Sequence, residues 1–365
     1  MNLELFRPLF DVSGPVISVH LDTSREDQDA GKRIQVEWRN LRQQLERQGA
    51  DPATLDVIEA EVGGAPEVVG PQGESLFAAD GRLLGAYTLA APPVRNRAVL
   101  APIADAVDTV LDYDRQLPHV VVAIDRQGGD IDAYEAGTLD AARSRSYSGS
   151  TLHITRVKAG GPSKASYHRR TENVWSANAA GVADEIVAAV EAVKAAVIFV
   201  GGDDKATAAL RGQPALQQTG VTLVDVSGGR GGGDAKDTLR RSVDDALSAA
   251  SRHAHADAFA RFEQSAASGD AISSIPAVAE ALGDGRVHTL MLSSNFPPGV
   301  MKWSTTSKPL VVASARGALG AEAHEAFETG AAALMLRAAV LSDAEFLEIP
   351  TDQEVVDGTA AFLRY

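Results

Sequence analysis

The chain has 365 residues, 45% of them hydrophobic and 23% charged, so its length predicts two or three globular domains with ordinary cores. It contains no cysteine, which excludes disulfides and leaves only His and carboxylate side chains as zinc ligands. The net charge of −15 opposes non-specific nucleic-acid binding, because a uniformly acidic surface repels phosphates. No apolar run approaches the roughly 20 residues of a membrane-spanning helix and no signal peptide is visible, so we expect a cytoplasmic protein.

The first segment, to about residue 115, has the pattern of a small α+β domain. Residues 16–21 alternate as a strand. Residues 34–45 carry an apolar stripe at helical spacing, and a second short helix follows at 55–62. Asp80-Gly81 predicts a two-residue hairpin turn between strands at 75–78 and 82–89. No catalytic motif is visible in this segment.

The second segment alternates strands with helices, which indicates an α/β sheet. A helix is expected at about 172–195, and a further helix precedes the last strand. The expected strands are 119–125, 131–134, 152–157, 196–200 and 221–226.

A glycine-rich break at 228–233 then leads into a long helix at about 234–262, which is suited to bridging two domains. The third segment repeats the α/β pattern, with a helix at 275–282 and strands at 288–292, 310–313 and 332–336. Together the segments predict a mixed α/β and α+β fold in three domains, which span residues 1–116, 117–266 and 267–365.

The glycine-rich stretches do not match phosphate-binding motifs. A P-loop needs Gly, four residues, Gly, Lys and Ser or Thr, and no register of residues 228–237 supplies that order. Gly201-Gly202 follows a strand but lacks the third glycine of a dinucleotide fingerprint. We therefore expect surface turns and no cofactor, with a nucleotide site as the lesser alternative.

Catalytic and metal-binding patterns are equally weak. His253 and His255 are two residues apart on a predicted helix, so they point to different faces and we expect solvent-facing roles and no metal site. No serine lies in a Gly-x-Ser-x-Gly context, and no catalytic residue is assigned. Acidic pairs at 203–204 and 244–245 read as solvated positions, with paired catalytic carboxylates as the lesser alternative.

One basic stretch departs from the acidic average. Between residues 156 and 170 there are five Lys or Arg and no acid. Gly160 and Gly161 permit backbone geometries that allow close approach to a ligand. The cations suit phosphates, and Tyr167 and His168 offer stacking faces for unpaired bases. The alternative is a surface hairpin that happens to be basic. The five cations are Arg156, Lys158, Lys164, Arg169 and Arg170.

The run Gly160-Gly161-Pro162-Ser163, followed by Tyr167, Arg169 and a long helix, resembles the Gly-Gly-Gln-Ser loop and helix of the archaeal and eukaryotic class I release factors. Further stretches are similar to this family and to Pelota in the same order, so the resemblance covers about residues 118–365. The N-terminal third resembles an actinobacterial branch related to the ribosome hibernation factor Balon. The collinear stretches are residues 197–202, 224–229, 277–291 and 358–365.

This resemblance implies a tRNA-shaped factor that occupies the ribosomal A site during hibernation, stress protection or rescue. The basic loop of its middle domain would protrude into the peptidyl-transferase centre. The implied partners are the ribosome, through the rRNA of those two sites, and elongation factor Tu, with no membrane. The residues expected to contact rRNA are Lys158, Gly160, Gly161, Pro162, Ser163, Lys164, Tyr167, His168, Arg169 and Arg170.

Pro162 stands where the family's release chemistry uses glutamine. Proline has no side-chain amide to orient water and no backbone N–H to donate, so we expect no peptide release and no enzyme activity. Three alternatives stay open: a peptidyl-tRNA hydrolase that uses another loop residue, a Pelota-like nuclease, and an unrelated stress-response scaffold. A nuclease would need a metal held by carboxylates after the first strand, namely Asp22, Glu26, Asp27 and Asp29.

Overall fold

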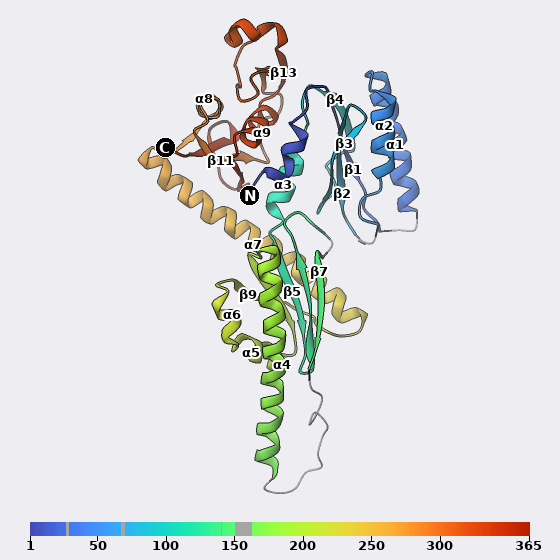
Figure 1. Cartoon of the computed structure of the whole chain (residues 1–365), viewed down its shortest axis with the longest axis vertical. Coiled ribbons are helices and arrows are strands. Elements are labelled where there is room, and N and C mark those ends of the chain that lie inside the picture. The colour runs from blue at the N-terminus through green and yellow to red at the C-terminus, as the bar shows by residue number, and fades with distance from the viewer. Residues whose placement is uncertain (27–28, 67–69, 140, 150–162) are drawn as a thin grey trace. The chain divides into compact units, whose positions relative to one another are not determined.

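The computed structural model describes residues 1–26, 29–66, 70–139, 141–149 and 163–365, with the backbone alone at 163–173. These residues form two compact units (Figure 1). Unit 1 combines Met1–Arg115 with Arg252–Tyr365, and unit 2 is Gln116–Ser251. The mixed α/β and α+β class is confirmed. The boundaries of three domains at 116 and 266 stay a prediction, and the first and last of those stretches share unit 1 here.

The first sheet of unit 1 is antiparallel, with strand order β3-β2-β1-β4. Helices α1 (Ala30–Arg47) and α2 (Pro52–Glu61) cover one face. The stripe of α1 buries Trp38 completely among the strand residues, as its helical spacing predicts. The strands are β1 (Val16–Asp22), β2 (Gly73–Ala79), β3 (Arg82–Leu89) and β4 (Arg97–Ala101).

The second sheet of unit 1 has the order β10-β15-β11-β14, and within it β11 and β14 run parallel. Helices α8 (Ile275–Gly283) and α9 (Ala331–Leu341) pack against this sheet. A separate antiparallel pair joins β12 (Met301–Ser304) to β13 (Phe327–Gly330). The sheet strands are β10 (Ala271–Ser273), β11 (Val287–Ser293), β14 (Glu345–Ile349) and β15 (Thr359–Leu363).

Two strands predicted in the third segment are wrong. Residues 332–336 lie in α9, where apolar residues are buried on almost every side, so the short apolar run carried no period that separates helix from strand. Residues 310–313 form no strand, and in that stretch the pairing is a single bridge between Ala313 and Trp303.

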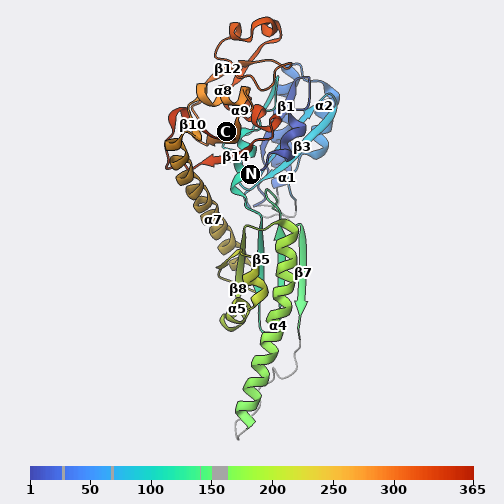
Figure 2. The same cartoon turned by 60° about the vertical axis from the view of Figure 1, so that its left-hand side comes forward.

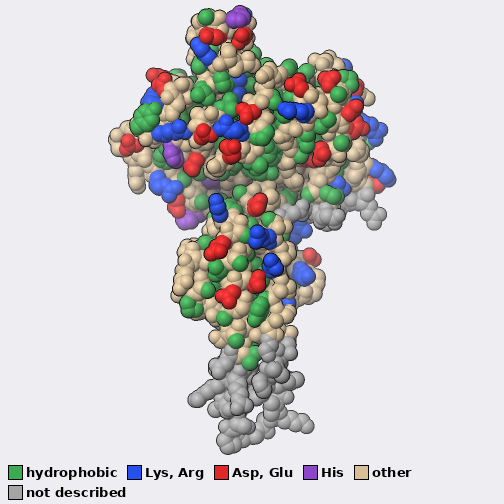
Figure 3. All heavy atoms as spheres, in the orientation of Figure 1, with side chains coloured by type: hydrophobic (Ala, Val, Ile, Leu, Met, Phe, Trp, Pro, Cys, Tyr) green, Lys and Arg blue, Asp and Glu red, His purple; other side chains and the backbone are tan. Residues whose placement is uncertain are grey.

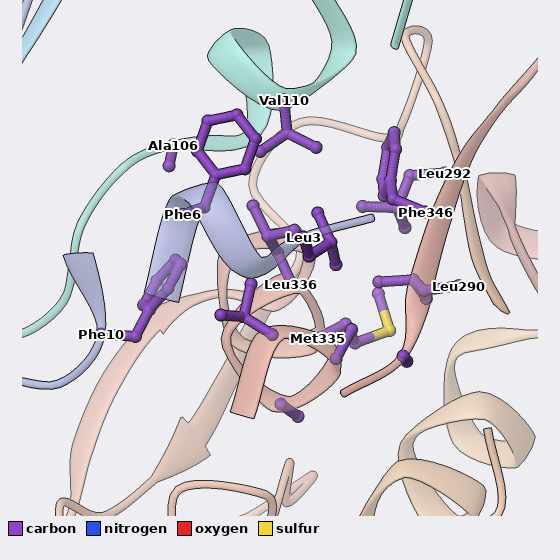
Figure 4. Close-up of a cluster of buried hydrophobic side chains, with 14 of the residues drawn as sticks. Leu3, Phe6, Phe10, Ala106, Val110, Leu290, Leu292, Met335, Leu336 and Phe346 are labelled. Atoms are coloured by element: carbon purple, nitrogen blue, oxygen red, sulfur yellow. The ribbon is translucent and has the colours of Figure 1, made fainter. Parts of the chain in front are cut away.

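One hydrophobic core joins the two stretches of unit 1 (Figure 4). The 3-10 helix η1 (Glu4–Leu9) contributes Phe6, which is fully buried and stacks on Tyr87 with ring centroids 5.1 Å apart. Helix α3 (Val107–Arg115) adds Val110. From the last stretch, Leu290, Leu292, Met335 and Phe346 complete the cluster. The core therefore ties the beginning of the chain to its end.

A buried polar group lies within unit 1 at the end of α3. Asp114 accepts a hydrogen bond from the backbone N–H of Glu348 at 2.7 Å and lies 2.9 Å from Nε2 of His255. His255 belongs to the long helix α7 (Gly233–Ser268) and is only 6% exposed. The expected solvent-facing role is therefore wrong for His255, because a carboxylate from a distant helix pairs with it. His253 is exposed.

Glu74 on β2 gives unit 1 a pH-dependent stability. Burial raises the pKa of its carboxyl to about 7, against an ordinary value of 4.5, although the backbone N–H of Gly63 donates to it at 3.1 Å. Between pH 4.5 and about pH 7 the unfolded chain therefore binds fewer protons than the folded chain. The free energy of unfolding falls as pH rises through this range.

Replacing Glu74 with Gln removes this titration while keeping an acceptor for the Gly63 N–H. We expect Glu74→Gln to raise Tm relative to the parent protein at pH 8 by several degrees, at about 2–4 °C per kcal/mol for a unit of this size. At pH 4.5 the variant and the parent protein should have nearly the same Tm. Thermal unfolding followed by circular dichroism measures both, and an equal Tm difference at the two pH values would contradict the titration of Glu74.

Unit 2 is a five-stranded sheet between helices, with the order β7-β6-β5-β8-β9. Strands β5, β8 and β9 are parallel, β6 is antiparallel to β5, and β7, which pairs with β6 in antiparallel fashion, runs in the same direction as β5. Helices α4 (Ser163–Val193), α5 (Asp204–Arg211) and α6 (Pro214–Gln218) lie on one face, and α7 covers the other (Figures 1 and 2). The strands are β5 (His119–Ile124), β6 (Gly128–Tyr134), β7 (Arg143–Ser148), β8 (Val197–Gly202) and β9 (Thr222–Asp225).

Candidate nucleic-acid interface

The carboxyl ends of the parallel strands in unit 2 form one edge, and the chain enters the 150–162 segment there. Gly149 follows β7, and its N–H donates to the carbonyl of Gln127 at 2.7 Å. A Cβ at residue 149 would lie 2.0 Å from the side-chain oxygen of Asn178 on α4, so glycine is needed for this close approach. The edge therefore fixes where the segment leaves the sheet.

The predicted rRNA-binding residues fall on or beside this segment. Lys158, Gly160, Gly161 and Pro162 lie outside the described residues. Ser163 begins α4, and the remaining candidates lie in its first turns, where the backbone is helical and the side chains are not described. Their role stays a prediction. These helical candidates are Ser163, Lys164, Tyr167, His168, Arg169 and Arg170.

A cluster of Arg126, Asp203 and Trp175 joins α4 to the carboxyl edge. Arg126 donates from Nε and Nη2 to the two carboxylate oxygens of Asp203, at 3.1 and 2.8 Å. The same guanidinium lies 4.9 Å from the ring centroid of Trp175, and Lys205 lies over that ring at 5.8 Å. Asn178 adds a hydrogen bond from Nδ2 to the carbonyl of Arg126 at 3.0 Å. The cluster holds α4 to the carboxyl edge at Trp175 and Asn178, just after residues 163–173, whose side chains are not described.

The Arg126 guanidinium, which hydrogen-bonds to Asp203, holds the pKa of that carboxyl below its ordinary value. Asp203 also caps α5, because it accepts hydrogen bonds from the N–H groups of Lys205 and Ala206 at 3.1 and 3.3 Å. The acidic pair at 203–204 is thus only partly the solvated turn expected, since Asp203 has a structural role.

Removing the Asp203 carboxylate should destabilise unit 2. Asp203→Ala is expected to cost about 1–2 kcal/mol of unfolding free energy, from the lost cap and a half-exposed ion pair. Asp204→Ala is the matched control, because Asp204 is exposed and belongs to the first turn of the same helix. Urea denaturation measures both. Equal losses for the two variants would show that the Arg126 pair and the cap contribute nothing.

A second ion-pair group holds the loop after β9. Arg230 donates from Nε to Asp130 at 3.1 Å and from Nη1 to Asp125 at 3.3 Å. The loop is packed, because a Cβ at Gly228, which has φ of +97°, would lie 2.4 Å from the backbone N of Leu239. Close packing against the start of α7 therefore explains why residue 228 is glycine.

Exposed cations that the sequence analysis missed lie on the edge strand β7. Arg143 and Arg145 are exposed and make no ion pair within 4 Å with any residue that the structure describes. They alternate with serine and share a face with Tyr147, which packs against the α4 side of the sheet. The alternating Arg-Ser-Arg-Ser-Tyr pattern was the signal for this strand. Figure 3 shows basic and acidic side chains intermixed on the visible face of unit 2.

The described carboxylates that a nuclease would need do not lie together around one site. Asp22 accepts from the N–H of Ser24 at 2.9 Å and lies 3.5 Å from Arg33. Asp29 pairs with Lys32 at 2.9 Å, and Asp27 lies outside the described residues. Across the described ranges, no group of three His, Asp or Glu side chains is placed to hold a metal ion. In the same ranges, no helix is long and apolar enough to cross a membrane.

A family model described as bacterial archaeo-eukaryotic release factor family 2 matches residues 118–268. Residues 118–268 are therefore similar to that family. The match covers all of the unit 2 sheet, the 150–162 segment and α7. It confirms the resemblance to archaeo-eukaryotic release factors over the middle of the chain, and residues 118–268 are called the release-factor segment from here on.

Two proteins of Mycobacterium tuberculosis, Rv2629 and MT2704, are each 29% identical to this chain over 204 residues. The aligned residues are 56% of this chain and 54% of each relative, so the match spans about half the length of these proteins.

The chain is also similar to solved structures of translation factors at low identity. The archaeal termination factor aRF1 is 15% identical, with 99% of this chain and 96% of that chain covered and a TM-score of 0.24. Archaeoglobus fulgidus Pelota is 14% identical, with 80% and 79% covered and a TM-score of 0.34. A model of ribosome-bound archaeal Pelota and ABCE1 is 13% identical, with 99% and 93% covered and a TM-score of 0.40. TM-scores this low leave the family match as the finding that identifies the release-factor segment.

Proposed function

We propose that this protein is a ribosome-associated translation factor that occupies the A site through its basic segment at 156–170. The observation that carries the proposal is the family match of residues 118–268, which spans that segment. The basic residues it contains, on a chain of net charge −15, give RNA phosphates a local site of attraction.

Helix α4 of unit 2 supports the proposal that this segment reaches into a narrow site walled by RNA. Helix α4 has 31 residues and is therefore about 45 Å long. Its C-terminal half is packed on the sheet through Val182, Ala183 and Ile186, while its N-terminal end extends beyond the sheet (Figure 1). A helix held at one end is a stiff support for the residues that begin it, which are the predicted rRNA contacts.

The proposed action is occupation of the site without hydrolysis. Pro162 supplies neither an amide side chain nor a backbone N–H, so the loop lacks the group that would orient water at a peptidyl-tRNA ester. Binding would then exclude tRNA from idle or stressed ribosomes, as a hibernation or protection factor does. Delivery by elongation factor Tu belongs to the same proposal.

Co-sedimentation with bacterial ribosomes tests the binding, and competition with tRNA tests the site. We expect binding to vacant ribosomes to be lost when the A site is filled with aminoacyl-tRNA, because both ligands need the same space. Binding that is unaffected by A-site tRNA would overturn the assignment to this site.

Two activity assays separate the alternatives. Ribosomes loaded with peptidyl-tRNA should keep their peptide when the protein is added, and stoichiometric release would replace this proposal with that of a hydrolase. Ribosome-bound mRNA and tRNA should stay intact, and cleavage abolished by EDTA would favour the nuclease alternative.

A further inference from the structure

Helix α9 of unit 1 buries an arginine within an apolar sequence. Arg337 is 3% exposed. One of its terminal nitrogens, Nη2, donates to the hydroxyl of Ser304 at 2.5 Å and to the carbonyl of Thr305 at 3.1 Å. Its guanidinium lies 5.4 Å from the ring centroid of Phe327. These neutral partners hold the side chain in place without cancelling its charge.

The charge of Arg337 is uncompensated where the structure describes the chain. No described carboxylate lies within ion-pairing distance, and its Nε is buried without a hydrogen-bond acceptor. Burial lowers the pKa of the guanidinium to about 10, so it stays protonated at neutral pH. A buried cation without an anionic partner is costly, and a bound anion is one of the arrangements that offset this cost.

A pocket of about 570 Å³ opens beside this arginine, which contributes to its lining. The volume lies in the range of small-molecule sites. Nine of the thirteen lining residues are apolar, and Ser13 and Thr306 are neutral polar groups. Asp11 also lines the pocket, but it is exposed and forms no ion pair with Arg337. The apolar wall includes Leu9, Phe10, Val12, Ile103, Leu310 and Leu341.

We propose that this pocket binds a small organic monocarboxylate, with its carboxylate on Arg337 and its apolar body along the wall of Leu9, Phe10 and Leu310. Guanidinium groups bind carboxylates through their N–H donors, and Arg337 lines the pocket without an anionic partner among the residues that the structure describes. A single cation balances one negative charge, which favours a carboxylate over a doubly charged phosphate. This site is independent of ribosome binding, which the release-factor segment would perform.

Isothermal titration calorimetry of the full chain with octanoate tests the site. We expect saturable binding of octanoate, at least tenfold weaker binding of octanol, which has no charge, and at least tenfold weaker binding of inorganic phosphate, which has no apolar body. Octanoate that fails to bind, or that binds no better than octanol, would overturn the proposal.

Two variants assign the binding to this pocket. Arg337→Met keeps the apolar length of the side chain and should weaken octanoate at least tenfold. Leu310→Trp should fill the pocket and do the same with the arginine intact. Arg286→Met is the matched control, because Arg286 is paired with Asp284 outside the pocket and its loss should leave octanoate binding unchanged.

Thermal unfolding separates a ligand site from a structural arginine. Arg337→Met removes a buried unpaired charge but also the donor to the Ser304 hydroxyl and the Thr305 carbonyl, and because these two effects oppose each other we expect only a small change in Tm. If Arg337→Met binds octanoate as the parent protein does, the proposal fails. If that variant does not fold, Leu310→Trp decides, and unchanged octanoate affinity in it would equally refute the site.

Discussion

The variant Lys164→Glu/Arg169→Glu/Arg170→Glu is expected to bind ribosomes about 100-fold more weakly than the parent protein, with a flatter salt dependence. Each cation that neutralises a phosphate releases counterions, so three lost contacts reduce the slope of log K against log salt by roughly 2–3. Reversed charges also repel the phosphates they would otherwise meet. Co-sedimentation at several salt concentrations measures both the affinity and the slope.

A control variant with the same change in net charge separates local contact from overall repulsion. Lys236, Arg241 and Arg252 are exposed on α7, and their triple change to Glu makes the chain equally more acidic. It should lose less than about tenfold in affinity, since distant charges are screened within about 10 Å at ordinary salt. Equal losses in the two variants would mean that the basic segment makes no specific contact.

The second large effect concerns the core that ties the ends of the chain together. Phe6→Ala should reduce the unfolding free energy of unit 1 by about 3–5 kcal/mol, because a fully buried aromatic ring is replaced by a cavity. Phe6 packs with Tyr87 and Tyr113 from the first stretch and lies in the same cluster as residues of α9 and β14. Both stretches of unit 1 should therefore lose stability together.

Hydrogen exchange measured by mass spectrometry resolves this coupling. Amides of β1 and β11 should both exchange faster in Phe6→Ala by similar factors, while those of β5 and β8 in unit 2 keep their protection. Phe199→Ala is the control, because Phe199 is fully buried in the core of unit 2 and should give the reverse pattern. Faster exchange in β1 alone would show that the two stretches fold as separate domains.

Local sequence patterns predicted those elements whose side chains alternate between a core and solvent. The α1 stripe is an example, because Ile34, Trp38 and Leu45 face one core. The Asp80-Gly81 turn is another, since both residues have positive φ, at 51° and 69°, as this type of hairpin requires. In these places the local preference and the final packing agree.

The elements and contacts that sequence patterns misassigned or did not predict depend on residues far apart in the sequence. Helix α9 is buried on nearly every side, so its apolar run has no amphipathic period. Strand β7 pairs with β6, and its exposed arginine and serine residues lack the apolar side that marks a buried strand in a sequence. The burial of His255 depends on Asp114, which lies 141 residues away in the sequence.

For the candidate site too, the part that is local in sequence could be predicted and the part that joins distant residues could not. The basic run at 156–170 is local in sequence and could be recognised directly. The anchor beneath it joins Arg126, Trp175 and Asp203 from three separate elements, and no spacing rule would have brought them together. The Arg337 pocket is likewise formed by stretches from both ends of the chain.

The claim that the basic segment enters the ribosome is tested most directly by cryo-electron microscopy of bacterial ribosomes incubated with the purified protein. We expect density for the chain in the A site, with residues 158–170 against rRNA of the peptidyl-transferase centre. Ribosomes that carry the protein elsewhere, with this segment away from rRNA, or that carry no protein at saturating concentration, would contradict the proposed function.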